Sequence, residues 1–213
     1  MTGLMKTNLI ISYLEELLPD AICELDYTKD YELLIAVMLS AQTTDKRVNM
    51  VTKVLFYEYQ SLEDLKNADV SDLEKIIRSL GTYTRKAYNI KMIATILLEN
   101  DYSYVPNDRS FLENLPGVGR KTCNVVLANL YNEPCIAVDT HVSRVSIRLG
   151  IAKKEDNVLT IEKKLNKIFP KEMLNSLHHR IVLFGRYYCK AAKPGCGDCK
   201  LKKICKYYGE MHK

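Results

Sequence analysis

The stretch that decides the fold reads Leu112-Glu113-Asn114-Leu115-Pro116-Gly117-Val118-Gly119-Arg120-Lys121. Two glycines flank a valine in this stretch and join one helix-like segment to the next. Glycine permits turns with positive φ, and its missing Cβ lets backbone N–H groups at the start of the second helix approach an anion closely. We therefore predict a helical hairpin whose turn can hold a phosphate without reading a base. The glycines alone would equally suit an ordinary helix–helix turn.

Outward from this hairpin the sequence has a helical pattern throughout. Apolar residues recur at three- and four-residue spacing, as in Leu9-Tyr13-Leu17 and Ile90-Ile93-Leu97, and no segment alternates as a strand does. Ser61-Leu62-Glu63-Asp64 and Ser71-Asp72-Leu73-Glu74 each match a capping box at a helix start. Proline and glycine breaks divide the chain into about ten helices. The sequence therefore predicts an all-α fold.

Composition and charge narrow the class of partner. The chain has 213 residues, of which 47% are apolar, enough for one medium domain or two small ones. No apolar stretch reaches the roughly 20 residues of a membrane helix, and Met1 to Asn8 lack a signal-peptide core, so we expect a cytoplasmic protein. Residues 1–107 hold 11 Lys/Arg and 16 Asp/Glu, whereas residues 108–213 hold 20 and 10. The basic half favours a polyanionic partner, although a solvated lysine-rich surface would have the same composition.

The C-terminal segment contains four cysteines with the spacing C-x6-C-x2-C-x5-C: Cys189, Cys196, Cys199 and Cys205. Four soft ligands this close together predict a metal bound by thiolates, and Pro194-Gly195 supplies a turn between them. The spacing alone leaves structural zinc and an iron–sulfur cluster both open. Six lysines crowd the same segment and predict lowered thiol pKa values together with phosphate contacts: Lys190, Lys193, Lys200, Lys202, Lys203 and Lys206.

The other three cysteines lie scattered in apolar sequence: Cys23, Cys123 and Cys135. An odd total of seven cysteines in a cytoplasmic chain argues against disulfides. We predict that these three are buried structural thiols.

Two residues near the hairpin are candidates for catalysis. Lys121 stands in the first turn of the second helix, where the positive end of the helix and Arg120 disfavour another cation, so its amine is a candidate nucleophile. A solvated or phosphate-contacting lysine is the simpler alternative. Asp139 lies in Val138-Asp139-Thr140-His141, before a helix with an apolar face. It can cap that helix, and it can also accept a proton or stabilise a cationic sugar.

The hairpin, Val138-Asp139-Thr140-His141 and the cysteine spacing together resemble endonuclease III, a family of DNA glycosylases with a [4Fe–4S] cluster. Leu33 to Asp45 also matches the family's early helix and turn, so the resemblance covers almost the whole chain. It implies two helical domains with a DNA-binding groove between them. Residues 23–133 would form a six-helix barrel bearing the helix–hairpin–helix, and residues 1–22 with 134–213 would form the domain that carries the cluster loop, 189–205.

The resemblance also implies an activity in base-excision repair. Oxidised or saturated pyrimidines would be flipped out of duplex DNA and removed by a bifunctional DNA N-glycosylase and abasic-site lyase. Lys121 would attack the sugar C1′ with help from Asp139, and β-elimination would cut the strand 3′ to the lesion. We expect a monomer, associated with the nucleoid, that binds damaged or abasic duplex DNA. The implied DNA-binding residues are Gln42, Thr82, Gly117, Val118, Gly119, Arg120, His141, Lys190 and Lys193, and the four C-terminal cysteines would hold a [4Fe–4S] cluster.

One position departs from the family pattern. In Leu80-Gly81-Thr82-Tyr83, Thr82 stands where the family usually has an apolar residue that wedges into the base stack. We hypothesise an altered opposite-base preference or weaker flipping.

Two other functions remain open from the sequence. The first is a monofunctional glycosylase of the adenine-mismatch branch. Two features argue against it: that branch lacks a lysine at the position of Lys121, and it has an additional C-terminal domain without a counterpart after Lys213. A non-catalytic DNA-binding protein with a zinc-stabilised tail would use Lys121 as a phosphate contact and Asp139 as a cap.

Overall fold

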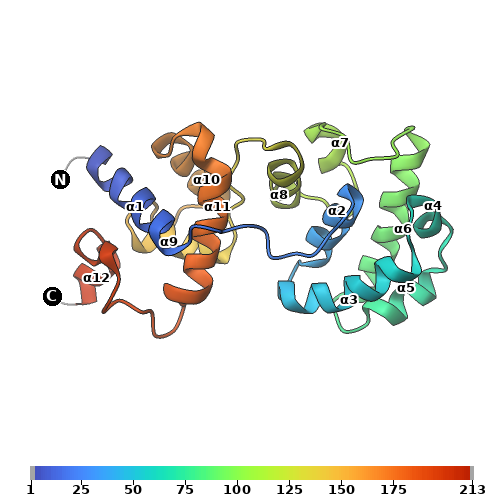
Figure 1. Cartoon of the computed structure of the whole chain (residues 1–213), viewed down its shortest axis with the longest axis horizontal. Helices are drawn as coiled ribbons and strands as arrows, with labels where there is room; N and C mark the ends of the chain where they lie inside the picture. The colour runs from blue at the N-terminus through green and yellow to red at the C-terminus, as the bar shows by residue number, and fades with distance from the viewer. Residues whose placement is uncertain (1–2, 212–213) are drawn as a thin grey trace. The chain divides into compact units, whose positions relative to one another are not determined.

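The computed structural model describes residues 3–211, and every regular element in that range is helical (Figure 1). The predicted all-α fold is therefore confirmed. None of the described helices is long and apolar enough to cross a membrane. Residues 1–2 and 212–213, which belong to the predicted terminal segments, lie outside the described residues.

The chain folds into two compact units. One consists of Glu24–Tyr131 and is called the hairpin unit below. The other consists of Met1–Cys23 together with Asn132–Lys213 and is called the cysteine unit.

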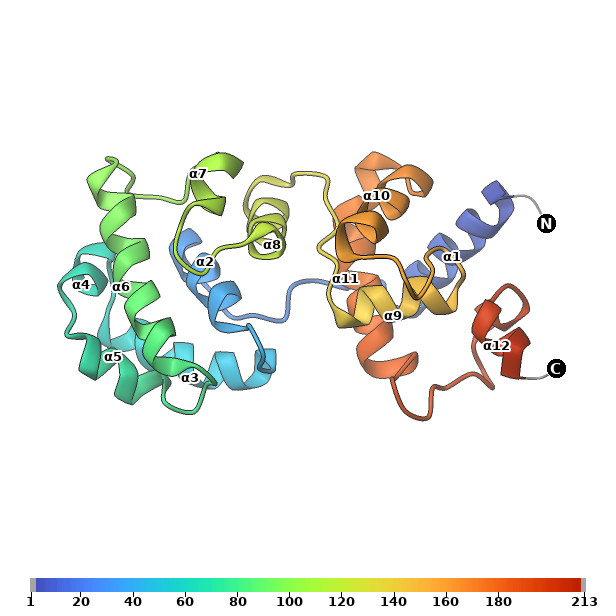
Figure 2. The same ribbon diagram turned by 180° about the vertical axis from the view of Figure 1, so that it is seen from behind.

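The hairpin unit is built around one helix that is buried on all its faces, α2 (Asp30–Leu39). Nine of its ten residues are buried, so the other helices of the unit must cover it from several sides. It contacts α3, α6 and α8 (Figure 2). The remaining helices of this unit are α3 (Asp45–Glu58), α4 (Leu62–Asn67), α5 (Val70–Ile77), α6 (Tyr83–Glu99), α7 (Arg109–Glu113) and α8 (Arg120–Tyr131).

One of the two predicted capping boxes is wrong. Ser61 caps α4 as predicted, because its hydroxyl accepts a hydrogen bond from the N–H of Asp64 at 3.0 Å. Ser71, however, lies inside α5. The cap of that helix is Asp69, whose carboxylate accepts from the N–H of Ser71 at 2.8 Å. An aspartate two residues upstream caps a helix at least as well as the serine does, and the helix therefore starts earlier.

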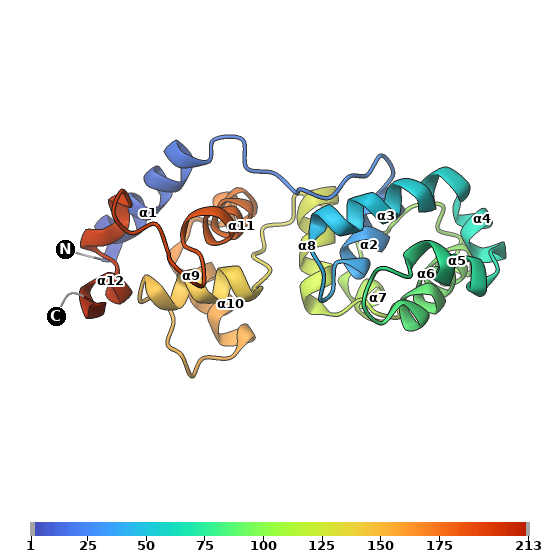
Figure 3. The same ribbon diagram turned by 90° about the horizontal axis from the view of Figure 1, so that it is seen from below.

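The cysteine unit joins the two ends of the sequence. Figures 1 and 3 show α1 (Gly3–Leu17) beside the C-terminal elements, and it packs against α11 and η3. Its buried residues Ile10 and Leu14 share one apolar core with Val142, Leu165 and Ile181. The other elements are α9 (Thr140–Arg148), α10 (Val158–Ile168), the 3-10 turns η1 (Lys171–Met173) and η3 (Lys200–Lys203), α11 (Leu174–Leu183), the π-helical turn η2 (Phe184–Tyr188) and α12 (Lys206–Met211).

Candidate active site and metal centre

The predicted hairpin connects α7 to α8. Leu115 and Val118 are both buried, and the N–H of Val118 donates to the carbonyl of Leu115 at 3.1 Å, so the turn is anchored in the core. Gly117 has φ of +80°, and a Cβ there would lie 2.5 Å from Nδ2 of Asn89. Gly119 has an ordinary φ, and a Cβ there would meet open space. Gly117 is therefore needed for the turn itself, while Gly119 leaves the first amides of α8 open to a ligand. Since the side chain of Val118 is buried, its backbone is the part that can face DNA.

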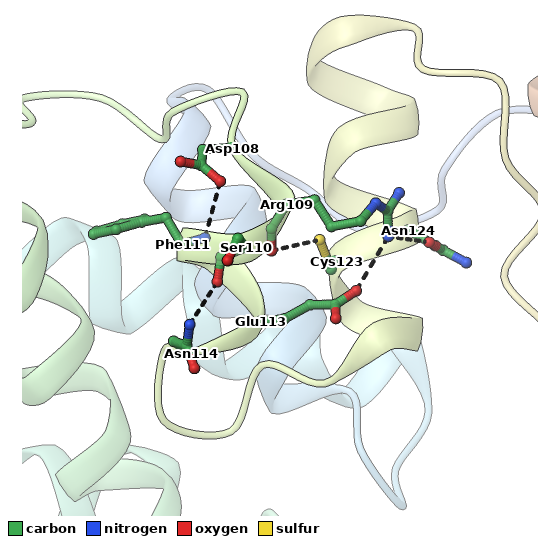
Figure 4. Close-up of polar contacts among 8 residues, drawn as sticks. All are labelled: Asp108, Arg109, Ser110, Phe111, Glu113, Asn114, Cys123 and Asn124. Atoms are coloured by element: carbon green, nitrogen blue, oxygen red, sulfur yellow. Dashed lines mark hydrogen bonds and ion pairs between the residues drawn. The ribbon is translucent and has the colours of Figure 1, made fainter.

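Polar contacts hold the two helices of the hairpin together (Figure 4). The guanidinium of Arg109 on α7 donates to Oδ1 of the buried Asn124 on α8 at 2.7 Å, and it contacts Glu113 at 3.2 Å. Asp108 caps α7 by accepting from the N–H of Phe111 at 3.0 Å. This brace fixes the direction of α8 and hence of the residues in its first turn. Sequence reasoning missed it, although Asn124 within the apolar run of α8 is a usable signal.

The other predicted catalytic and DNA-binding residues of the hairpin unit are exposed. Lys121 is the second residue of α8 and is exposed, as is Arg120 before it. Gln42 and Thr82 are exposed and have φ of 60° and 56°. Positive φ is uncommon for residues other than glycine and costs about 1–3 kcal/mol, so such residues are candidates for functional positions.

Asp139 is the N-cap of α9 in the cysteine unit, as predicted. Its Oδ1 accepts from the N–H of Val142 at 2.7 Å, and the residue is half-buried. Within residues 3–211 we find no hydrogen bond to its second carboxylate oxygen. His141, one residue into the helix, has Nδ1 3.2 Å from Nη2 of Arg144. The cap thus holds the carboxylate in one orientation and leaves one oxygen available for chemistry.

All four C-terminal cysteines line one cavity in the cysteine unit. The cavity holds about 420 Å³ of empty space, part of it open to solvent, and apolar residues such as Phe184 and Leu201 form much of its wall. Among the described residues, no three His, Cys, Asp or Glu side chains converge closely enough to hold a metal ion. Four thiols that line one cavity can supply the ligands of a shared metal centre.

The predicted lowering of thiol pKa values by lysines is wrong for Cys196 and Cys199. Burial raises the pKa of the Cys196 thiol, and the neighbouring Cys189 and Cys205 raise it further. Burial also raises the pKa of Cys199. The lysines act elsewhere: Lys200 pairs with Glu16 of α1, and Lys202 donates to the carbonyl of Gly197 at 2.6 Å. Thiolates that are buried and close to one another require a cationic partner, which a bound metal centre supplies.

Two arginines of α9 hold the start of the cysteine segment. Arg144 donates to the carbonyls of Cys189, at 3.1 Å, and Gly185, at 2.5 Å. Arg148, one turn later, donates to the Sγ of Cys189 at 3.3 Å, to the carbonyl of Lys190 at 2.7 Å and to that of Ala191 at 3.0 Å. The helix that begins at Asp139 therefore also fixes the first cysteine. Sequence reasoning missed this role, for which the four-residue spacing of the arginines was the available signal.

The path of the chain into the cysteine segment depends on η2. The N–H of Cys189 donates to the carbonyl of Phe184 at 2.7 Å. Donor and acceptor are five residues apart, as in a π-helix, rather than the four of an α-helix. A Cβ at Gly185 would lie 2.9 Å from Cβ of His141, so this glycine permits close packing on α9. The predicted turn at Pro194-Gly195 is present, because the N–H of Cys196 donates to the carbonyl of Pro194 at 2.9 Å. The N–H of Gly195 also donates to the carbonyl of Tyr188 at 3.0 Å.

The remaining predicted positions are placed as follows. Lys190 and Lys193 are exposed on the cysteine segment. Cys123 and Cys135 are buried, as predicted for structural thiols, but Cys23 is partly exposed because it lies in the irregular connection after α1.

Comparison with known proteins identifies the family. Residues 35–171 match the HhH-GPD superfamily of base excision DNA repair proteins. Endonuclease III of Bacillus subtilis (strain 168) is 45% identical over 206 residues, which cover 97% of this chain and 94% of that protein. The chain belongs to the endonuclease III family. It is therefore a base excision repair enzyme of the DNA glycosylase and abasic-site lyase class.

Other members of the endonuclease III family agree in sequence and structure. The Escherichia coli (strain K12) protein is 43% identical over 198 residues, 93% of each chain. A trapped covalent intermediate of endonuclease III with DNA matches with a TM-score of 0.94 at 45% identity over 100% of both chains. A non-covalent endonuclease III–DNA complex matches with the same TM-score at 46% identity.

We expect Arg148→Met to loosen the start of the cysteine segment, because the carbonyls of Lys190 and Ala191 lose charged donors. The local opening free energy should fall by about 1–3 kcal/mol. Amide hydrogen exchange of Cys189 and Gly195, whose N–H groups are hydrogen-bonded, measures it. Lys154→Met, on an exposed lysine of the same unit, is the control. Equal exchange in the two variants would show that Arg148 does not hold the segment.

Proposed function

We propose that this enzyme removes oxidised or saturated pyrimidines from duplex DNA and then cuts the strand 3′ to the resulting abasic site. The observation that carries the proposal is the position of Lys121, an exposed amine in the first turn of α8 directly after a glycine turn open to phosphate. The match to an endonuclease III trapped covalently on DNA supports this proposal. A covalent adduct with DNA requires a nucleophile, and Lys121 is the residue we assign to that role.

We assign DNA binding to both units. In the hairpin unit, the backbone amides around Gly117 and Gly119 hold a phosphate, Arg120 supplies a positive charge beside them, and Gln42 and Thr82 probe the base stack. The cysteine unit carries 18 Lys/Arg against 11 Asp/Glu over residues 1–23 and 132–213, so it attracts the DNA backbone. Its assigned contacts are His141, Lys190 and Lys193. In this proposal the two units are the two domains that bind one duplex.

The proposed chemistry starts when the damaged nucleotide leaves the base stack. The Nζ of Lys121 attacks C1′, the C1′–N bond breaks, and the base departs with the bonding electrons and takes up a proton. The bound amine loses one proton, the C1′–O4′ bond of the sugar ring breaks, and O4′ takes up a proton, which leaves a protonated Schiff base between Nζ and C1′. Loss of a proton from C2′ then breaks the C3′–O bond, and the phosphate leaves as the 5′ end of the downstream strand. Asp139, held by its cap bond, stabilises positive charge on the sugar and accepts a proton from the amine.

We further propose that Cys189, Cys196, Cys199 and Cys205 hold a [4Fe–4S] cluster. Their shared cavity supports one common centre, and the raised pKa of the Cys196 thiol supports a cationic one. When bound, the cluster would fix the shape of the segment that presents Lys190 and Lys193. The enzyme would act as a monomer in the cytoplasm, on nucleoid DNA.

Borohydride trapping tests the nucleophile. On a duplex with dihydrouracil or thymine glycol, the wild type should give a covalent adduct, and Lys121→Gln should give none because an amide cannot form a Schiff base. Lys53→Gln, on an exposed lysine of the same unit, should trap like the wild type. An adduct that survives Lys121→Gln would remove Lys121 as the nucleophile. No adduct with the wild type would instead favour a non-catalytic DNA-binding protein.

Metal analysis tests the cluster. Aerobically purified protein should be brown and contain about four iron and four sulfide ions per chain. Cys199→Ser should lower the iron content, while Cys123→Ser, at a buried cysteine outside the cavity, should not. Colourless protein that contains zinc would contradict the assignment.

Thr82→Leu tests the departure from the family pattern. Leucine restores an apolar wedge at this exposed turn, so we expect faster excision and a changed ranking of the four opposite bases. Single-turnover rate constants for dihydrouracil opposite each base measure the effect. Identical rate constants for wild type and variant on all four duplexes would refute the wedge hypothesis.

A further inference from the structure

The hairpin unit contains a buried lysine, Lys86, that has no role in the proposed reaction. Lys86, in the first turn of α6, is only 4% exposed. Its ammonium donates to the carbonyls of Leu39, at 2.9 Å, and Ala41, at 2.8 Å. Within residues 3–211 it has no carboxylate partner, and burial lowers its pKa. A buried cation without a counter-ion is costly to keep, which indicates that the two carbonyl contacts matter.

These carbonyls belong to the turn that carries Gln42. The turn runs from Ser40 to Thr43 and is closed by the N–H of Thr43, which donates to the carbonyl of Ser40 at 3.2 Å. Gln42 is its third residue and has φ of 60°. Glycine or asparagine usually occupies this position in a turn whose third residue has positive φ. The sequence therefore does not by itself favour the conformation that Gln42 adopts.

The contact between Lys86 and Ala41 explains how that conformation is held. In a four-residue turn, the peptide between the second and third residues can rotate by about half a turn, and the third residue then changes from positive to negative φ. The carbonyl of Ala41 belongs to this peptide. While it accepts from the ammonium of Lys86, the peptide cannot rotate without leaving a buried charge and lone pair unsatisfied.

The same helix positions two other predicted DNA contacts. The backbone N–H of Lys86 donates to the carbonyl of Thr82 at 3.1 Å, and Thr82 is another exposed turn residue with positive φ. Three residues later, Nδ2 of Asn89 lies against Gly117 in the hairpin. The first two turns of α6 thus touch all three DNA-facing turns of the hairpin unit.

We propose that Lys86 is a positioning residue for DNA interrogation: by holding the Ala41–Gln42 peptide, it keeps the Gln42 side chain in the orientation that enters the space left by the flipped nucleotide. This inference rests on the proposed function, because it takes Gln42 as the residue that fills the gap. Without Lys86 the turn relaxes toward negative φ at Gln42. The left-handed conformation is disfavoured about 10-fold for a residue other than glycine, so the competent orientation becomes the minor one.

A double-mutant cycle tests this coupling. The single-turnover excision rate constant on a dihydrouracil duplex is measured for wild type, Lys86→Met, Gln42→Ala and the double variant. We expect Lys86→Met to lower the rate constant about 10-fold, and to lower it no further when Gln42 is already alanine. Thermal unfolding reports whether each variant is folded, and Lys86→Gln, which can still donate to one carbonyl, provides a milder variant for the same cycle.

The matched control is Lys91→Met. Lys91 is on the same helix and also donates to a backbone carbonyl, that of Ala68 at 2.8 Å, but it does not contact the Gln42 turn. Its variant should excise within about twofold of the wild type. Equal losses in the Lys86 and Lys91 variants, full activity of folded Lys86→Met, or losses at Lys86 and Gln42 that multiply would each overturn the proposal.

A second measurement separates this inference from the proposed function. The same cycle is run on the equilibrium affinity for a duplex with a tetrahydrofuran abasic analogue, which requires no chemistry. If the wild type excises nothing, the proposed activity fails, while non-additive affinities would still support the role of Lys86. If the wild type excises and both cycles are additive, only the inference about Lys86 fails.

Discussion

The structure depends on one constraint: the backbone groups at helix ends have no partner within the helix and must find one elsewhere. At the end of α2, the ammonium of Lys86 on α6 donates to the carbonyl of Leu39. At the start of α9, Asp139 supplies a partner locally. At the start of α8, the preceding residue is Gly119, which has no side chain with which to cap the helix. Side chains therefore complete two helix ends that shape turns, while the start of α8 has no side chain at Gly119 and suits an external phosphate.

In the cysteine unit, α9 connects two tasks. Its first turn orients Asp139, and its last turn carries Arg148, which binds the segment that starts at Cys189. Because one rigid helix carries both residues, a displacement of the cysteine segment would also displace Asp139 at the start of α9. The metal centre that we propose would therefore influence the carboxylate that we assign to catalysis without taking part in the reaction, through the packing of η2 on α9 that Gly185 permits.

Much of the fold was readable from the sequence because its signals are local. Helical periodicity, the hairpin glycines and the cap at Asp139 involve residues within a few positions of one another. The contacts that sequence reasoning missed join residues far apart, such as Arg148 with Lys190 and Lys86 with Ala41. An arginine or lysine in a helix pattern predicts an exposed face, and only tertiary packing reveals that these cations hold carbonyls. The wrong cap predicted at Ser71 has a different cause: Asp69, two residues earlier, is also a suitable N-cap, and the local sequence does not decide between them.

The strained turns of the hairpin unit show why stability and recognition are linked there. Gln42 and Thr82 each cost about 1–3 kcal/mol in their conformations, a substantial part of the 5–15 kcal/mol that stabilises a typical domain. Such strain persists only where the surroundings determine the backbone more strongly than the residue does. Here the surroundings are α2, which is almost wholly buried, and the first turns of α6. The tight core therefore maintains two exposed side chains in orientations that an isolated turn would not keep, so the DNA contacts that we assign to them would be positioned before DNA binds.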